Sequence, residues 1–258
     1  MRLNFKKYGQ DGPVLIILHG LFGSLDNWHT LAGRFAEDFC VFTVDQRNHG
    51  KSPHSDHHNY RLMAKDLAEF MEQHELKTAA VLGHSMGGKT AMQFAMQFPE
   101  KVEMLLVADM APKAYDPHHD SIIEALENLD LDKVNKRNEA DEQLAQYIKS
   151  EGVRLFLLKN LARKENGGYR WKMNLPVISD HYEEISAALE AGKPFEKPAL
   201  FIRGENSNYI LEEDQPDIRK IFPAALFATV KDAGHWLHAD QPDTFYSIVK
   251  TFIEQKQA

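Results

Sequence analysis

The sequence has little of what secreted and membrane-spanning proteins need. Its 258 residues include a single cysteine, Cys40, so no disulfide can form within the chain and we expect a reduced, cytoplasmic setting. No apolar run approaches the roughly 20 residues that a membrane span needs. Residues 1–7 also lack the apolar core of a signal peptide. We therefore expect a cytoplasmic protein that does not insert into membranes.

Positive charge is scarce as well. Lysine and arginine number 30 against 38 aspartates and glutamates, which gives a formal net charge of −8. A surplus of negative charge repels the phosphates of nucleic acids and of anionic lipids. Nucleic acid is therefore excluded as the main partner, and we expect a small-molecule ligand. We expect the chain to be a monomer or a homodimer.

The sequence also lacks a convincing metal-binding motif. Two groups of histidines lie close to aspartates, at residues 54–58 and 116–119. Neither has the spacing that closes a tetrahedral metal site, and solvated loops account for both. We expect no metal and no cofactor. Asp45 and Arg47, which directly follow an apolar run, are interpreted as bracing a loop.

Short apolar runs alternate with helical patterns in the first and last parts of the chain. Such runs are typical of parallel strands that are covered on both faces of a sheet. They lie at residues 14–18, 40–44, 79–82, 104–108, 198–204 and 225–230. This alternation predicts an α/β fold with a doubly wound, mostly parallel sheet.

Residues 112–192 break this alternation. They show helical stripes of apolar residues and no convincing parallel strand. We interpret them as a helical lid inserted into a core that is formed by residues 1–111 and 193–258. The stripes have no other core to complete, so we expect some of them to face the centre of the fold.

The chain is organised around Ser85. Residues 83–87 read Gly-x-Ser-x-Gly, with an apolar run before them and a helix-forming segment after them. This order is that of a nucleophile elbow, in which a strained turn lifts the serine hydroxyl above the sheet. The two glycines avoid side-chain clashes at such a turn. We therefore interpret Ser85 as the nucleophile of an acyl-transfer reaction.

Acyl transfer also needs a base and hydrogen-bond donors for the oxyanion. His235 follows the run 225–230 and precedes the last helical pattern, and the order serine, acid, histidine is the one that this architecture uses. We expect the oxyanion donors to be the backbone amides of Met86 and Leu21. Leu21 is favoured over Phe22 for the second donor.

Several motifs together resemble a known family. They are His19-Gly20-Leu21-Phe22-Gly23-Ser24-Leu25-Asp26-Asn27, Asp45-x-Arg47-Asn48-His49-Gly50-x-Ser52, Gly83-His84-Ser85-Met86-Gly87-Gly88-Lys89, Asp109-Met110-Ala111-Pro112 and Gly234-His235-Trp236. This set is similar to that of the α/β-hydrolase superfamily, and more closely to small cytoplasmic bacterial esterases related to the mitochondrial abhydrolase-domain lipases. The resemblance covers essentially the whole chain and is weakest in the lid.

The resemblance implies an α/β-hydrolase fold and a serine hydrolase that cleaves carboxylic esters or acyl thioesters through an acyl-enzyme on Ser85. Acyl-CoA is one such thioester, and the basic residues of segment 154–172 could meet its phosphates. The alternative interpretation is that these charged residues simply lie on solvent-exposed helix faces. The residues that we expect around the acyl chain are Phe22, Phe156, Leu157, Tyr182 and Trp236.

The acid of the triad departs from the commonest superfamily pattern. That pattern places it a few residues after the strand 198–204, where this chain has Ser207. Asp109 instead ends the strand after the elbow helix, at the sheet edge where active-site groups gather, and the related esterases share this aspartate. We therefore expect Asp109 to orient His235, with Ser207 as an auxiliary hydrogen-bond partner.

Two other functions fit the same fold. One is a lyase of menaquinone synthesis or a C–C bond hydrolase, because Lys89 lies where such lyases carry an arginine for a substrate carboxylate. The other is a non-enzymatic small-molecule sensor that retains the triad. Turnover of simple p-nitrophenyl esters would distinguish an esterase from the sensor.

Overall fold

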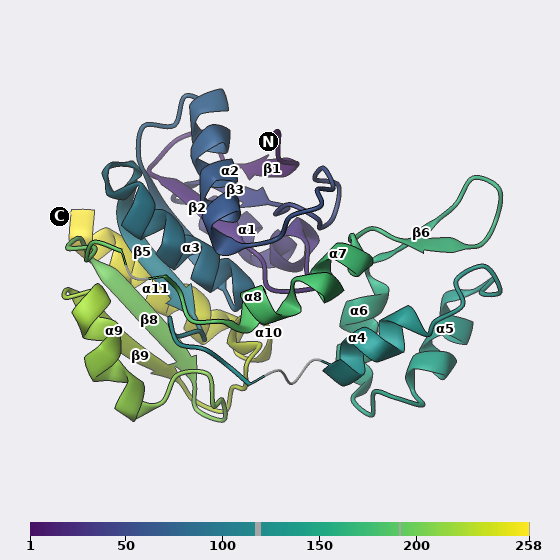
Figure 1. Cartoon of the computed structure of the whole chain (residues 1–258). Helices are drawn as coiled ribbons and strands as arrows, with labels where there is room; N and C mark the ends of the chain where they lie inside the picture. The colour runs from purple at the N-terminus through teal and green to yellow at the C-terminus, as the bar shows by residue number, and fades with distance from the viewer. Residues whose placement is uncertain (117–119, 191, 258) are drawn as a thin grey trace.

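A seven-stranded sheet forms the centre of the protein (Figure 1). The computed structural model describes residues 1–116, 120–190 and 192–257. The strand order is β1-β3-β2-β4-β5-β8-β9, and only β1 runs antiparallel to its neighbour. The strands are β1 (Phe5–Tyr8), β2 (Val14–Leu18), β3 (Cys40–Val44), β4 (Ala79–His84), β5 (Val102–Ala108), β8 (Ala199–Gly204) and β9 (Ala225–Val230). This arrangement confirms the predicted α/β fold class.

Helices cover both faces of the sheet, which is why the central strands are apolar throughout. Side chains alternate between the two faces, so Leu15 and Ile17 belong to one apolar core while Ile16 and Leu18 belong to the other. The first core is closed by α1 (His29–Phe35) and α11 (Pro242–Gln257). The second is closed by α2 (Tyr60–Gln73), α3 (Met86–Gln97) and α9 (Gln215–Ile221).

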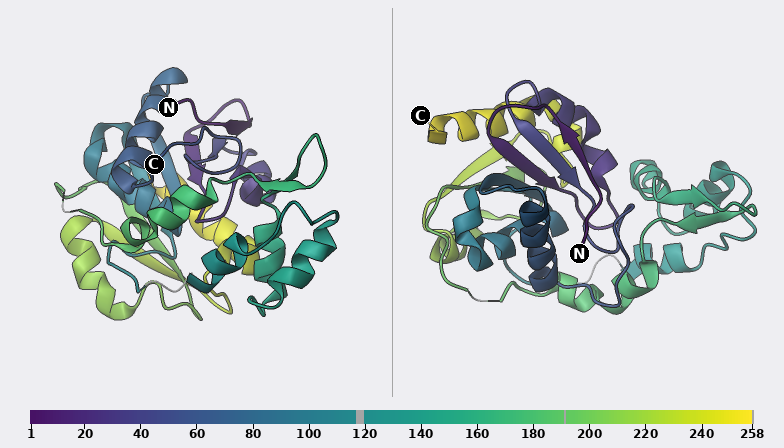
Figure 2. Two further views of the ribbon diagram at one scale, coloured as in Figure 1. Left: turned by 45° about the vertical axis from the view of Figure 1, so that its right-hand side comes forward. Right: turned by 90° about the horizontal axis from the view of Figure 1, so that it is seen from above.

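The segment between β5 and β8 forms a lid that projects from one side of the core (Figures 1 and 2). Its own apolar cluster includes Phe22, which comes from the loop after β2. The lid elements are α4 (Asp120–Glu127), α5 (Arg137–Leu144), α6 (Glu151–Leu158), β6 (Leu161–Arg163), β7 (Tyr169–Trp171), α7 (Leu175–Asp180) and α8 (Tyr182–Ser186).

The expectation that the lid contains only helical patterns was wrong at one place. β6 and β7 pair as an antiparallel hairpin. Between them lie Gly167 and Gly168, both with positive φ angles, of 89° and 74°. Consecutive glycines of this kind make a tight hairpin connection accessible. The strands have only three residues each, too few to show an alternating pattern.

A buried ion pair ties the loop after β3 to α2. Arg47 donates from Nε to Oδ2 of Asp66 at 2.6 Å and from Nη2 to Oδ1 at 2.9 Å, and both side chains are about 5% exposed. Asp45 accepts hydrogen bonds from the amides of Leu25 and Lys51. Both residues thus brace loops, as the sequence indicated.

Removing the charge of Asp66 is expected to destabilise the fold strongly. In Asp66→Asn the buried guanidinium of Arg47 loses its counter-ion, which should lower the free energy of unfolding by about 3 kcal/mol. Urea unfolding followed by circular dichroism measures this change. The control is Asp217→Asn, which breaks an exposed pair with Lys220 and should cost less than about 1 kcal/mol. Equal losses would contradict the expectation.

Candidate active site

Ser85 lies on the sharp turn between β4 and α3, with φ 54° and ψ −120°. Such a turn is possible because glycine flanks it on both sides. A Cβ on Gly83 would lie 2.0 Å from the carbonyl oxygen of Gly87, and a Cβ on Gly87 would lie 2.5 Å from that of Leu18. The strand, turn and helix of the predicted elbow are therefore present, in a backbone arrangement that excludes larger residues.

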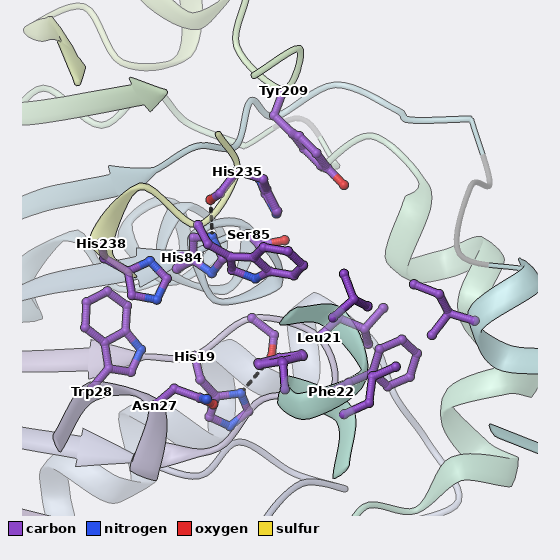
Figure 3. A pocket seen from close by; sticks show the side chains of 16 residues that line it. His19, Leu21, Phe22, Asn27, Trp28, His84, Ser85, Tyr209, His235 and His238 are labelled. Atoms are coloured by element: carbon purple, nitrogen blue, oxygen red, sulfur yellow. Dashed lines mark hydrogen bonds between the residues drawn. The ribbon is translucent and has the colours of Figure 1, made fainter. Parts of the chain in front are cut away.

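His235 and Asp109 come from different loops and meet next to this turn. The Nδ1–H of His235 donates to Oδ2 of Asp109 at 2.8 Å. Asp109 follows β5 and is fully buried. Its carboxylate also accepts a bond from the amide of Gly204 at 3.1 Å and a short one from the hydroxyl of Ser207. His235 and Ser85 line the same cavity, and Figure 3 shows them side by side.

The surroundings of Asp109 act on its pKa in two directions. Burial raises this pKa to about 7, whereas the hydrogen bonds from Ser207 and Gly204 lower it. Donors directed at a carboxylate favour its ionised form. An imidazolium at His235 would favour that form further, because opposite charges would then face each other at 2.8 Å.

The carboxylates after β8 have other partners. Glu205 accepts a hydrogen bond from the amide of Asp232. Asp214 forms an ion pair with Lys113 at 2.7 Å and accepts from the amide of Leu211. Of Asp109, Glu205 and Asp214, it is therefore Asp109 that the structure places on the imidazole.

The loop after β2 presents backbone amides beside the elbow. The amide of Phe22 donates to Nε2 of His49 at 3.3 Å, while Nδ1 of His49 donates to the carbonyl oxygen of Arg47. Met86 is the first residue of α3, where a helix amide has no acceptor within the helix. The amide of Phe22 is thus engaged by His49, which favours Leu21 over Phe22 as the second oxyanion donor, and Met86 stays the expected first donor.

The side chain of His19 links the loop after β2 to the loop after β3. Its Nε2 accepts from the amide of Gln46 at 3.0 Å, and its Nδ1 donates to the carbonyl oxygen of Gly20 at 2.8 Å. Burial lowers the pKa of His19 to about 4, so the ring is neutral at pH 7. It therefore carries the single proton that these two bonds require.

Two cavities adjoin Ser85. The larger has a volume of about 250 Å³ and is lined by His235 together with four residues expected around an acyl chain, namely Phe22, Phe156, Leu157 and Trp236. The rings of Phe156 and Trp236 lie 5.8 Å apart, which joins the lid to the loop of His235. Tyr182 lines the second cavity instead, which has a volume of about 30 Å³.

Two contacts of His235 were not foreseen from the sequence. The ring of Tyr209 stacks on the imidazole with centroids 3.8 Å apart. His84 donates from Nε2 to the carbonyl oxygen of His235 at 2.8 Å, drawn as a dashed line in Figure 3. Burial lowers the pKa of His84 to about 3, so this ring is neutral. Both contacts join segments that are distant in sequence, which no local pattern reveals.

The described residues form neither a cluster of metal ligands nor a helix suited to cross a membrane. Within residues 1–116, 120–190 and 192–257, no three histidine, cysteine or acidic side chains come together as a metal site would require. His118 and His119, from the second histidine group, lie outside the described residues. No helix in the described parts of the chain is both long enough and apolar enough to traverse a bilayer.

Comparison with known proteins assigns the family. The family model of the alpha/beta hydrolase fold matches residues 13–242. The chain belongs to the α/β-hydrolase family. A solved structure of a marine microorganism esterase superposes with a TM-score of 0.95 at 46% sequence identity, covering 97% of this chain and 99% of that one. The predicted resemblance to this superfamily and to its esterases is therefore confirmed.

Two curated relatives extend over nearly the whole chain. The sn-1-specific diacylglycerol lipase ABHD11 of Danio rerio is 40% identical over 252 residues, which is 95% of this chain and 79% of the relative. Esterase YbfF of Escherichia coli is 35% identical over 258 residues, which is 98% of this chain and 99% of the relative. The relatives thus support an enzyme of the hydrolase class.

Proposed function

We propose that the protein is a serine esterase that cleaves carboxylic esters through an acyl-enzyme on Ser85. The observation that carries this proposal is the 2.8 Å hydrogen bond from Nδ1 of His235 to the buried Asp109. It directs the other ring nitrogen, Nε2, away from the carboxylate. His235 lines the cavity that Ser85 also lines.

The residues then act in a fixed order. Ser85 Oγ attacks the ester carbonyl carbon while Nε2 of His235 takes the hydroxyl proton. The amides of Leu21 and Met86 receive the negative charge of the carbonyl oxygen. The bond to the alcohol oxygen breaks, and His235 returns the proton to that oxygen. Water then releases the acid from Ser85 by the same steps, and Asp109 stabilises the imidazolium in both halves.

The larger cavity supports an ester with an apolar portion, because its lining includes Phe22, Phe156, Leu157 and Trp236. A CoA thioester receives less support from the lid. Lys164 is paired with Asp132 at 2.6 Å and Arg154 with Asp141 at 2.7 Å. These two cations of the basic segment are therefore already engaged inside the lid.

The first test is turnover of p-nitrophenyl acetate and p-nitrophenyl butyrate. The wild-type protein should hydrolyse both, and Ser85→Ala should lose the activity and the covalent labelling by a fluorophosphonate. Ser247→Ala, an exposed serine on α11, is the matched control and should retain both. A folded wild-type protein without turnover would instead favour a sensor.

The proposed role of Asp109 predicts that substituting Asp109 itself lowers activity much more than substituting Ser207, which donates to its carboxylate. Asp109→Asn should lower kcat by about 10,000-fold, because the amide favours the wrong tautomer of His235. Ser207→Ala should cost about tenfold, on the order of one neutral hydrogen bond. Steady-state kinetics measures both effects. An active Asp109→Asn beside an inactive Glu205→Gln or Asp214→Asn would assign the acid elsewhere.

The lid should set the preference for chain length. Phe156→Ala or Leu157→Ala enlarges the cavity, and each further buried methylene of a substrate is worth about 0.8 kcal/mol, or roughly fourfold in kcat/KM. The ratio of octanoate to butyrate ester hydrolysis should therefore rise. Leu155→Ala is the control, because this neighbouring side chain on α6 is 53% exposed. An unchanged ratio in all three variants would mean that the lid does not line the substrate path.

A further inference from the structure

The smaller cavity beside Ser85 contains a buried cation that the proposed reaction does not use. Its volume is about 30 Å³, and its lining includes Ser85 and the two oxyanion residues Leu21 and Met86. Lys89 lines it as well, one helical turn after Ser85 on α3. The cavity is therefore adjacent to the position of a scissile carbonyl.

The ammonium group of Lys89 is fully enclosed by protein. It donates to the carbonyl oxygens of Ala187 at 2.6 Å and Ser186 at 3.3 Å. The rings of Tyr115 and Tyr60 lie 5.0 Å and 5.6 Å from it. An ammonium has three N–H donors, so one of them lacks an acceptor within the described parts of the chain.

In the described parts of the chain this cation also lacks a counter-ion. Among the residues that the structure describes, no carboxylate lies within 4.0 Å of the Lys89 nitrogen. Burial lowers the pKa of Lys89 to about 7, which reflects the cost of an uncompensated buried charge. An anion that entered the cavity would supply the missing partner and the acceptor for the third N–H.

The cavity has the size for such a group. Roughly 10–15 Å³ of this kind of space holds one water molecule, so about 30 Å³ has room for two or three heavy atoms. A carboxylate has three. The rings of Tyr115 and Tyr182 also line the cavity.

We propose that this cavity binds a carboxylate of the substrate through Lys89, so that the preferred substrates are esters with a carboxylate a few bonds from the scissile carbonyl. The apolar remainder of such a substrate occupies the larger cavity. The proposal rests on the proposed function of Ser85 and adds a substrate class to it. The carboxylate belongs either to the acyl or to the alcohol portion of the ester.

Two pairs of substrates of nearly equal shape distinguish these portions. Mono-octyl succinate is compared with octyl 4-methylpentanoate, which replaces the acyl-side carboxylate by an isopropyl group of similar shape. 3-(Octanoyloxy)propanoate is compared with 3-methylbutyl octanoate, which does the same on the alcohol side. The wild-type enzyme should have a higher kcat/KM for the anionic member of one pair. In Lys89→Met the ratio of anionic to neutral kcat/KM should fall at least tenfold.

A purely structural role for Lys89 predicts a different result. Lys89 and Tyr60 both hold the end of α8, since the Tyr60 hydroxyl donates to the carbonyl oxygen of Ile185 at 2.7 Å. Tyr60→Phe removes that bond without changing charge, so it should leave the anionic-to-neutral ratio intact. If Lys89→Met also leaves this ratio intact, Lys89 only anchors the lid and the proposal is overturned.

A binding measurement tests the carboxylate site at Lys89 independently of the proposed ester hydrolysis by Ser85. Calorimetric titration of the Ser85→Ala variant with the two anionic esters gives their Kd values without turnover. The double variant Ser85→Ala, Lys89→Met should bind the preferred ester at least tenfold more weakly than the single variant Ser85→Ala. This comparison decides the role of Lys89 even if the wild-type protein hydrolyses no ester. Lys89→Gln, which keeps an N–H donor for Ala187, replaces Lys89→Met should the latter not fold. Equal Kd values would contradict the proposal.

Discussion

The close backbone contact between β4, α3 and the end of β2 is the constraint on which the rest of the site depends. Gly83 and Gly87 touch with no space for a Cβ, and Gly87 lies directly against the carbonyl oxygen of Leu18. The contact holds Ser85 at a φ of 54°, a strain on the order of 1–3 kcal/mol. The apolar cores on both faces of the sheet offset this strain. They also bring the loop after β2 alongside the serine.

The carboxylate of Asp109 joins the ends of three neighbouring strands. It follows β5, accepts from Gly204 at the end of β8 and from Ser207 just beyond, and binds His235 in the loop after β9. A buried carboxylate is costly unless donors surround it. Here those donors come from the segments that must be aligned for catalysis, so stabilising the charge also positions His235. The stack of Tyr209 on the imidazole then fixes the plane of the ring.

The sequence predicts the core of the molecule well because its signals are local. Continuous apolar runs mark strands that are buried on both faces, and glycines around Ser85 mark a turn that only glycine allows. The position of Asp109 needed the family resemblance, since several acids could follow a strand end. The stack of Tyr209 and the hairpin of β6 and β7 were missed. The stack forms between loops that are distant in sequence and meet only in the folded protein. The strands of the hairpin are too short to show an alternating pattern of apolar and polar residues.

The lid acts on the proposed oxyanion site as well as on the cavity. The amide of Phe22 is held by His49 from the core, whereas its carbonyl oxygen accepts from the side-chain amide of Asn160 in the lid at 2.6 Å. The peptide groups on either side of Phe22 are therefore fixed from two directions. Leu21, whose amide is the proposed donor, directly precedes this doubly held residue. The position of Leu21 therefore depends on the lid. The lid thus shapes the substrate cavity and also helps to place the backbone amide that is proposed to stabilise the oxyanion.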